Sequence, residues 1–274
     1  MKRPVIFLIA AMLLVTGLIF LTACQKGSSG ASKSKSQKNP IVGTWLLESY
    51  KYGSSESSFT QINANLPRIK LITEKKFLWV TYDTTTKKIL KSAGGEYTLD
   101  DDNYVESIDF GYNMDSYLKS KSKFRIRVEG RMLYLTGELG DGYKIEEIWQ
   151  KTNPAKNSKN NLTGTWLMET YKYGKDASAF IIVPPGRPHV QLITEDQFLW
   201  AIYDTTSKKI VESAGGKYQV DGKNFMVFVD YGYNMDNYLG IKSNYKVQVE
   251  KGMYFLTGDL VSNYKIEEIW NKVK

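Results

Sequence analysis

Gly-Thr-Trp-Leu at residues 43–46 opens a segment that ends in Tyr-Lys-Ile-Glu-Glu-Ile-Trp at residues 143–149. Both sequences return unchanged at residues 164–167 and 264–270. The residue directly after the first of them changes from Leu47 to Met168. Landmarks in between, such as Tyr-Asp-Thr-Thr and Ser-Ala-Gly-Gly, keep the same offset of 121 residues. A constant offset indicates the tandem duplication of one unit. Its length of about 110 residues is typical of an independent domain and exceeds the period of solenoid repeats.

Apolar and polar residues alternate with period two in each repeat, as in strands 124–128 (Phe-Arg-Ile-Arg-Val) and 245–249. The paired glycines at 94–95 and 215–216 predict a bulge or bend. The first repeat predicts eight strands, near 43–51, 67–73, 76–83, 88–99, 103–110, 122–129, 131–138 and 143–151. Eight antiparallel strands with short turns can close into an up-and-down barrel that is filled or holds one small ligand. The predicted fold class is all-β, with two tandem eight-stranded barrels.

The N-terminus has the pattern of a secretory signal. Lys2 and Arg3 precede an apolar run, and Leu-Thr-Ala-Cys at 21–24 resembles a bacterial lipobox. The run is nearly long enough to span a membrane, but Cys24, the only cysteine, favours lipidation. The predicted organisation is a signal peptide at 1–23, a flexible tether at 24–40, a first barrel at 41–152, a linker at 153–162 and a second barrel at 163–274.

The net charge of +8 comes from 37 Lys and Arg against 29 Asp and Glu. The excess lies in the signal, tether and linker, so the repeats are neutral and we do not expect nucleic-acid binding. Tether lysines near a lipid anchor could contact anionic headgroups. The lipoprotein resemblance, with no Asp after Cys24, implies the outer membrane of a bacterium, facing the periplasm.

Gly-x-Trp at the head of each repeat resembles the lipocalin signature, and the Ser-Ala-Gly-Gly-x-Tyr strand is similar to that of bacterial lipocalin-like (calycin-type) lipoproteins. The resemblance implies lipocalin-like barrels that bind a small apolar or amphipathic molecule. The arginine that packs over the signature tryptophan in that family is missing. Only Lys151 and Lys272 follow the last tryptophan of each repeat.

Catalytic and metal-binding residues are scarce. The one histidine, His189, corresponds to Arg68 in the first repeat, which excludes a Ser-His triad in both repeats and a His-based metal site. We expect no cofactor and no enzymatic activity. Strand parity with Trp149 and Trp270 would point Glu147 and Glu268 inward, where a carboxyl could act as acid or base. We favour instead a bulge that turns both to solvent, because burying an unpaired charge is costly.

Three further groups of residues are candidates for ligand binding. Two mid-strand tryptophans are more typical of core, although the core of a barrel is also its cavity wall. The repeated Gly-Tyr-Asn-Met-Asp segment is equally consistent with a short helical cap. The first long loop, apolar only in the second repeat, would lie at the barrel mouth. The candidates are Trp79, Trp200, Tyr112, Asn113, Asp115, Tyr233, Asn234, Asp236, Glu147, Glu268, Ile181 and Ile182.

These patterns predict a lipid-anchored envelope protein whose barrels bind a small apolar or amphipathic ligand without catalysis. A carbohydrate- or protein-interaction module is the first alternative, and a barrel enzyme using Glu147 or Glu268 is the second. A central cavity would favour ligand binding, whereas a filled barrel with an exposed aromatic strip would favour the interaction module. Paired inward carboxylates would favour the enzyme. The sequence leaves the oligomeric state open.

Overall fold

The computed structural model describes residues 39–56, 58–139, 141–153, 160–176, 178–260 and 264–274. The predicted signal peptide, the lipidation site at Cys24 and the tether as far as residue 38 lie outside these residues. Asn39 to Lys274 form one compact unit that contains both repeats. Among the described residues no helix is long and apolar enough to span a membrane.

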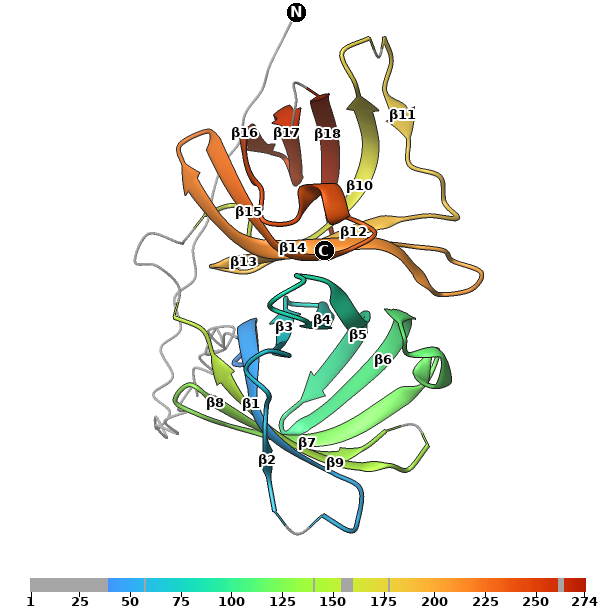
Figure 1. Ribbon diagram of the computed structural model, residues 1–274, viewed down its shortest axis with the longest axis vertical. Coiled ribbons are helices and arrows are strands. Elements are labelled where there is room, and N and C mark those ends of the chain that lie inside the picture. The colour runs from blue at the N-terminus through green and yellow to red at the C-terminus, as the bar shows by residue number, and fades with distance from the viewer. Residues whose placement is uncertain (1–38, 57, 140, 154–159, 177, 261–263) are drawn as a thin grey trace, which may run out of the picture. The chain divides into compact units, whose positions relative to one another are not determined.

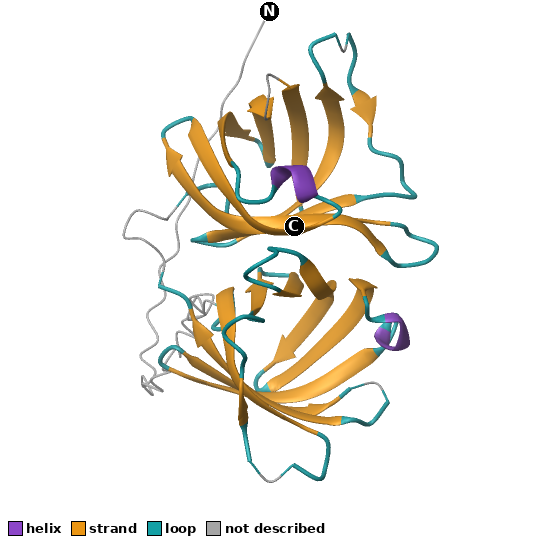
Figure 2. Cartoon of the chain, viewed as in Figure 1, coloured by secondary structure: helices purple, strands orange, loops and turns teal. Residues whose placement is uncertain are grey.

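The first repeat is a closed antiparallel barrel (Figures 1 and 2). Its elements are β1 (Gly43–Tyr52), β2 (Thr60–Gln61), β3 (Arg68–Ile72), β4 (Lys76–Tyr82), β5 (Ile89–Asp100), β6 (Asn103–Tyr112), η1 (Asp115–Tyr117), β7 (Lys121–Glu129), β8 (Met132–Glu138) and β9 (Lys144–Lys151). Each long strand pairs with the next, and β1 pairs with β9 to close the barrel.

The second repeat has the same order and is closed by β10 and β18. Its elements are β10 (Gly164–Tyr173), β11 (Ile181–Ile182), β12 (His189–Ile193), β13 (Gln197–Tyr203), β14 (Ile210–Asp221), β15 (Asn224–Tyr233), η2 (Asp236–Tyr238), β16 (Lys242–Glu250), β17 (Met253–Leu260) and β18 (Tyr264–Lys272). The prediction of two eight-stranded up-and-down barrels is confirmed. The two-residue strands β2 and β11, each an addition to the edge of the first strand, were not predicted.

The paired glycines form the predicted bulge. The register of β5 against β6 shifts between Gly94 and Gly95, and β14 repeats the shift. A Cβ on Gly95 would lie 1.9 Å from the carbonyl oxygen of Ser107. Only glycine therefore lets the two backbones approach this closely.

The Gly-x-Trp signature closes one end of each barrel. Trp45 is fully buried, and its indole nitrogen donates a 2.7 Å hydrogen bond to the carbonyl of Ile41. The ammonium of Lys151 lies 5.2 Å from the centre of the Trp45 ring, and Lys272 lies 5.1 Å from that of Trp166. Lysine thus takes the position over the tryptophan that the family resemblance gives to arginine.

Within the compact unit, the outer faces of β3–β6 and β12–β15 share one apolar cluster. Its contacts come in pairs related by exchange of the repeats. Tyr82 stacks on Tyr231 at 4.4 Å between ring centres, and the equivalent pair, Tyr203 and Phe110, stacks at 4.2 Å. Hydroxyl contacts of 2.5 Å join Thr44 to Thr194 and Thr73 to Thr165 in the same way. The repeats therefore meet through a pseudo-twofold surface.

Candidate ligand cavities

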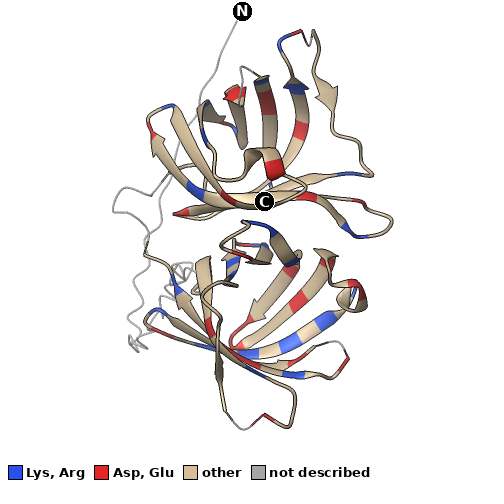
Figure 3. Cartoon of the chain, in the orientation of Figure 1, with Lys and Arg blue, Asp and Glu red and all other residues tan. Residues whose placement is uncertain are grey.

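Each barrel contains an open cavity between its strands. The first has a volume of about 220 Å³ and the second about 320 Å³. Trp79 and Trp200 line the respective cavities and also pack against the core, and their role in ligand binding stays a prediction. Figure 3 marks the positions of Lys, Arg, Asp and Glu residues along the strands of the barrels.

Glu147 and Glu268 both point inward and line their cavities. The expectation that a bulge would turn them to solvent is wrong. The register shift lies on the facing strand, between Leu47 and Ser49 of β1, so the Glu-Glu pair keeps its regular alternation. The cost of burying Glu147 is offset by partners, which the sequence argument did not identify.

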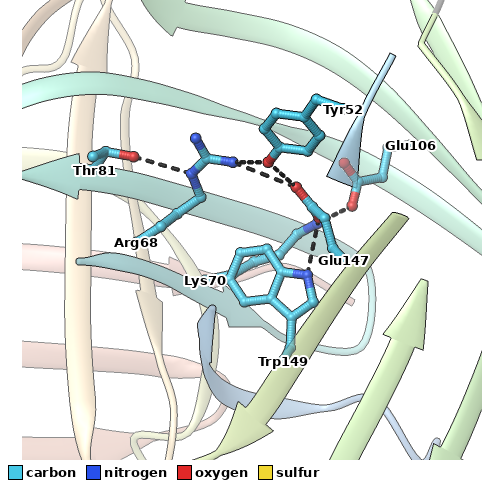
Figure 4. Close-up of polar contacts among 7 residues, drawn as sticks. All are labelled: Tyr52, Arg68, Lys70, Thr81, Glu106, Glu147 and Trp149. Carbon is cyan, nitrogen blue, oxygen red and sulfur yellow. Dashed lines mark hydrogen bonds and ion pairs between the residues drawn. The ribbon is translucent and has the colours of Figure 1, made fainter. Parts of the chain in front are cut away.

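A set of polar contacts surrounds Glu147 (Figure 4). Its carboxylate accepts hydrogen bonds from the Tyr52 hydroxyl at 2.5 Å and from the Trp149 indole nitrogen at 2.9 Å. The Arg68 guanidinium lies 3.4 Å from the same carboxylate and also donates to Tyr52 at 2.6 Å. A further bond to Thr81 at 3.0 Å fixes the guanidinium. The arginine therefore neutralises a carboxylate that is only 7% exposed.

Lys70 and Glu106 form a second buried ion pair in the first barrel (Figure 4). Their side chains are 5% and 7% exposed. The Lys70 ammonium also lies 5.1 Å from the Phe77 ring centre and 5.5 Å from that of Trp149. The carboxylate and the aromatic faces thus compensate the buried charge of the Lys70 ammonium inside the barrel.

The second barrel replaces three of these four charged residues. Arg68, Lys70 and Glu106 correspond to His189, Gln191 and Val227, whereas Glu147 corresponds to Glu268. Gln191 accepts a hydrogen bond from the hydroxyl of Tyr254, whose counterpart in the first barrel is a leucine. The ion pairs of the first cavity are therefore all absent from the second, whose described wall is mostly apolar.

Glu268 keeps the neutral hydrogen bonds of Glu147. The Tyr173 hydroxyl donates to it at 2.7 Å and the Trp270 indole nitrogen at 2.9 Å. Burial raises the pKa of the Glu268 carboxyl, and these two bonds only partly oppose the shift. Burial also lowers the pKa of His189 to about 4, so the histidine is neutral at pH 7. No arginine or lysine lines this cavity among the described residues.

The Gly-Tyr-Asn-Met-Asp segments lie at the surface between the repeats. Tyr112 stacks on Tyr233 with ring centres 3.9 Å apart. Ion pairs join Asp115 to Lys209 at 2.7 Å and Asp236 to Lys88 at 3.0 Å. The short helices η1 and η2 agree with the predicted cap, although no side chain caps them.

The asparagines of these segments fix the turn that precedes each helix. Asn113 has φ of 53°, and its side chain donates to the carbonyl of Leu90 at 2.7 Å. Asn234 repeats this arrangement with the carbonyl of Val211 at 2.8 Å. The structure gives both residues a local backbone contact, and neither lines a cavity.

Ile181 and Ile182 form the short strand β11, which pairs with Thr170 and Tyr171 of β10. They are 53% and 75% exposed and do not line the cavity, although β10 ends at the cavity residue Tyr173. The sequence argument did not propose Arg68, Lys70 or Glu106 as site residues. The signal that could have found them is the joint loss of these three charges from the second repeat.

Comparison with family models gives one match, which covers the first repeat and assigns it no function. A family model described as a domain of unknown function (DUF4488) matches residues 40–160, which contain the first barrel. No curated protein matches the chain.

Two solved structures show distant similarity. An uncharacterised protein, YLR301w from Saccharomyces cerevisiae, is 8% identical, covers 84% of this chain and 98% of its own, and has a TM-score of 0.44. A mutant of the vaccine antigen transferrin binding protein B from Haemophilus parasuis is 7% identical, covers 85% and 76%, and has a TM-score of 0.26. Similarity at this level does not bear on the function of the chain.

Proposed function

We propose that this chain is a non-catalytic binding protein of the bacterial cell envelope and that the second barrel holds its ligand, a small apolar or amphipathic molecule. The observation behind this proposal is the cavity of about 320 Å³, whose wall is mostly aromatic and aliphatic with a few convergent polar groups. Small-molecule sites in proteins commonly have this size and composition.

The first barrel is a weaker candidate for the same role. Its smaller cavity is crossed by Arg68 and Lys70, which are already paired with carboxylates. A ligand entering there would have to displace or bury charged groups, which costs free energy. We therefore assign the first barrel a structural role.

The envelope location is proposed from the N-terminal sequence. Lipidation at Cys24 would anchor the chain, and the tether would hold the barrels near the outer membrane, facing the periplasm. The interaction-module alternative has less support, because Tyr112 and Tyr233 contact each other. A catalytic role for Glu147 has less support as well, because Arg68 is paired with its carboxylate.

The test is a titration of residues 39–274 with N-phenyl-1-naphthylamine, a neutral apolar fluorophore. Matched cavity-filling variants locate the site: Val229→Trp in the second barrel and Ile108→Trp at the equivalent position in the first. We expect saturable binding that Val229→Trp removes and Ile108→Trp retains, with circular dichroism confirming that both variants fold. Binding lost only in Ile108→Trp, or no saturable binding at all, would contradict the proposal.

A further inference from the structure

The first barrel contains a built-in cation at a defined place in its cavity. The Arg68 guanidinium contacts the Glu147 carboxylate and the Tyr52 hydroxyl, and it lies 5.0 Å from the centre of the Trp79 ring. These three groups are the surroundings that a cation prefers inside a protein: an anion, a hydroxyl oxygen and an aromatic face.

The second barrel retains all three groups without the arginine. Tyr173, Glu268 and Trp200 occupy the equivalent positions and line the cavity. His189 replaces the arginine, and Ile202 replaces Thr81, which held the guanidinium in the first barrel. His189 is neutral at pH 7, because burial lowers its pKa to about 4, so it does not provide the missing charge.

The charge of the two cavity walls differs in the same sense. The first wall contains three cations, Arg68, Lys70 and Lys91, against two carboxylates. In the second, Lys91 is replaced by Glu212, so the described wall has two carboxylates and no lysine or arginine. A concave site lined by one sign of charge attracts ligands of the opposite sign.

A cationic ligand would also stabilise the ionised form of the Glu268 carboxyl. Glu268 accepts hydrogen bonds from Tyr173 and Trp270 but has no cationic partner among the described residues. An ionised carboxylate in this setting is unfavourable, and burial raises its pKa accordingly. Glu268 remains partly accessible where Glu147 is buried, and it fronts the cavity.

We propose that the second barrel binds a small organic cation, a protonated amine on an aromatic or aliphatic body, with its ammonium group between Glu268, Tyr173 and Trp200. The inference rests on the proposed function, that this cavity holds a small molecule, and specifies the chemical class. The ammonium takes the place of the Arg68 guanidinium, and the apolar body fills the rest of the cavity, which includes Phe198, Phe225 and Leu256.

The test compares three ligands of similar shape on residues 39–274 by isothermal titration calorimetry at pH 7. They are tryptamine, a cation, 3-propylindole, its neutral counterpart, and indole-3-propionate, an anion. Charge-assisted hydrogen bonding predicts that tryptamine binds roughly tenfold or more tightly than 3-propylindole, and that the anion binds most weakly.

Variants then identify the contact. Glu268→Gln should bring tryptamine to the affinity of 3-propylindole, whereas Glu267→Gln, the next residue on the same strand and absent from the cavity wall, should leave the preference unchanged. If Glu268→Gln does not fold, the double variant His189→Arg/Ile202→Thr answers the same question. It rebuilds the arginine and threonine of the first barrel and should abolish tryptamine binding.

The outcomes separate this inference from the proposed function. Equal affinity for tryptamine and 3-propylindole would overturn the cation proposal and leave ligand binding by the barrel intact. A cation preference that persists in both Glu268→Gln and His189→Arg/Ile202→Thr would overturn it as well. If neither the indoles nor N-phenyl-1-naphthylamine bind, both proposals are wrong.

Discussion

The two cavities differ far more than the barrels that enclose them. The first stabilises its interior with paired charges, Arg68 with Glu147 and Lys70 with Glu106. The second has only Glu268 of that set and a larger cavity. The strand order, the glycine bulges and the signature tryptophans are the same in both.

This difference shows that the same arrangement of strands does not require a charged interior. Buried ion pairs often stabilise a fold no better than apolar residues of similar volume, so the strands of the barrel can surround either kind of interior. The outer face shared by the repeats is apolar in both of them, because each contact there also fixes its pseudo-twofold equivalent. Inside the barrels, by contrast, three of the four paired charged residues of the first repeat have been replaced in the second.

The largest expected effect comes from separating the repeats. Isolated residues 163–274 would expose Val190, Leu192 and Leu199, which are buried in the shared cluster. Burial of such side chains contributes ~1.5–3 kcal/mol each at the upper limit. We still expect each repeat to fold alone, but the pseudo-twofold surface should pair with itself, so the isolated second barrel should form a homodimer in analytical ultracentrifugation.

The control is Leu199→Glu in the isolated second barrel, compared with the wild-type fragment. A buried, unpaired carboxylate in the surface between copies should prevent dimerisation while leaving the cavity residues in place. A wild-type fragment that stays monomeric at high concentration would mean that the repeats do not depend on this surface. The comparison of the cavities would then apply to two independent domains.

The next largest effect concerns the buried pair of the first barrel. Lys70→Met should lower the free energy of unfolding by about 3–5 kcal/mol, because it leaves Glu106 charged and without its partner. The double variant Lys70→Met/Glu106→Val removes both charges and should recover most of this loss. Urea denaturation of residues 39–274 measures both variants. A double variant as unstable as the single one would show that the first interior requires its charges.

The sequence was sufficient to predict the barrels but only part of the cavities. Period-two alternation locates strands because one face of each is buried, and the paired glycines mark a backbone approach that only glycine allows. The partners of Glu147 could not be found in this way. Arg68 and Lys70 come from β3, and their pairing with β6 and β9 follows from barrel closure across the interior, which alternation does not encode.

A smaller effect should appear in the pH dependence of the second barrel. The folded pKa of His189, about 4, lies below its unfolded value near 6.5. Its contribution to stability is therefore present above pH 6.5 and is lost as the pH falls from 6.5 to about 4. Wild type should lose more stability than His189→Asn between pH 7 and pH 4.5 in urea titrations.

The comparison with His189→Asn is needed because the titration of Glu268 changes stability with pH in the opposite direction. Its folded pKa is raised, so its unfavourable contribution diminishes as the pH falls. Glu268 is present in both proteins, and the difference between them isolates the histidine. Parallel pH profiles for wild type and His189→Asn would show that the imidazole is solvated in the folded protein, which would remove one support for the proposed cation site.

The smallest expected effect tests the end of the barrel where the repeats agree. Lys272 lies over the ring of Trp166, and Lys272→Met should cost about 0.5–1 kcal/mol through the lost cation–π contact. Lys151 makes the same contact with Trp45 and also donates to the carbonyl of Val42 at 2.6 Å. Lys151→Met should therefore cost about 1 kcal/mol more.

Arginine at either position should be tolerated, since its guanidinium can lie over the same indole face. Thermal denaturation of the four single variants of residues 39–274 gives the measurement. If Lys272→Met has no effect while Lys151→Met does, the carbonyl contact rather than the tryptophan face explains the lysine. The resemblance of this position to the arginine of lipocalins would then be one of location only, and the two repeats would differ at their closed ends as well as in their cavities.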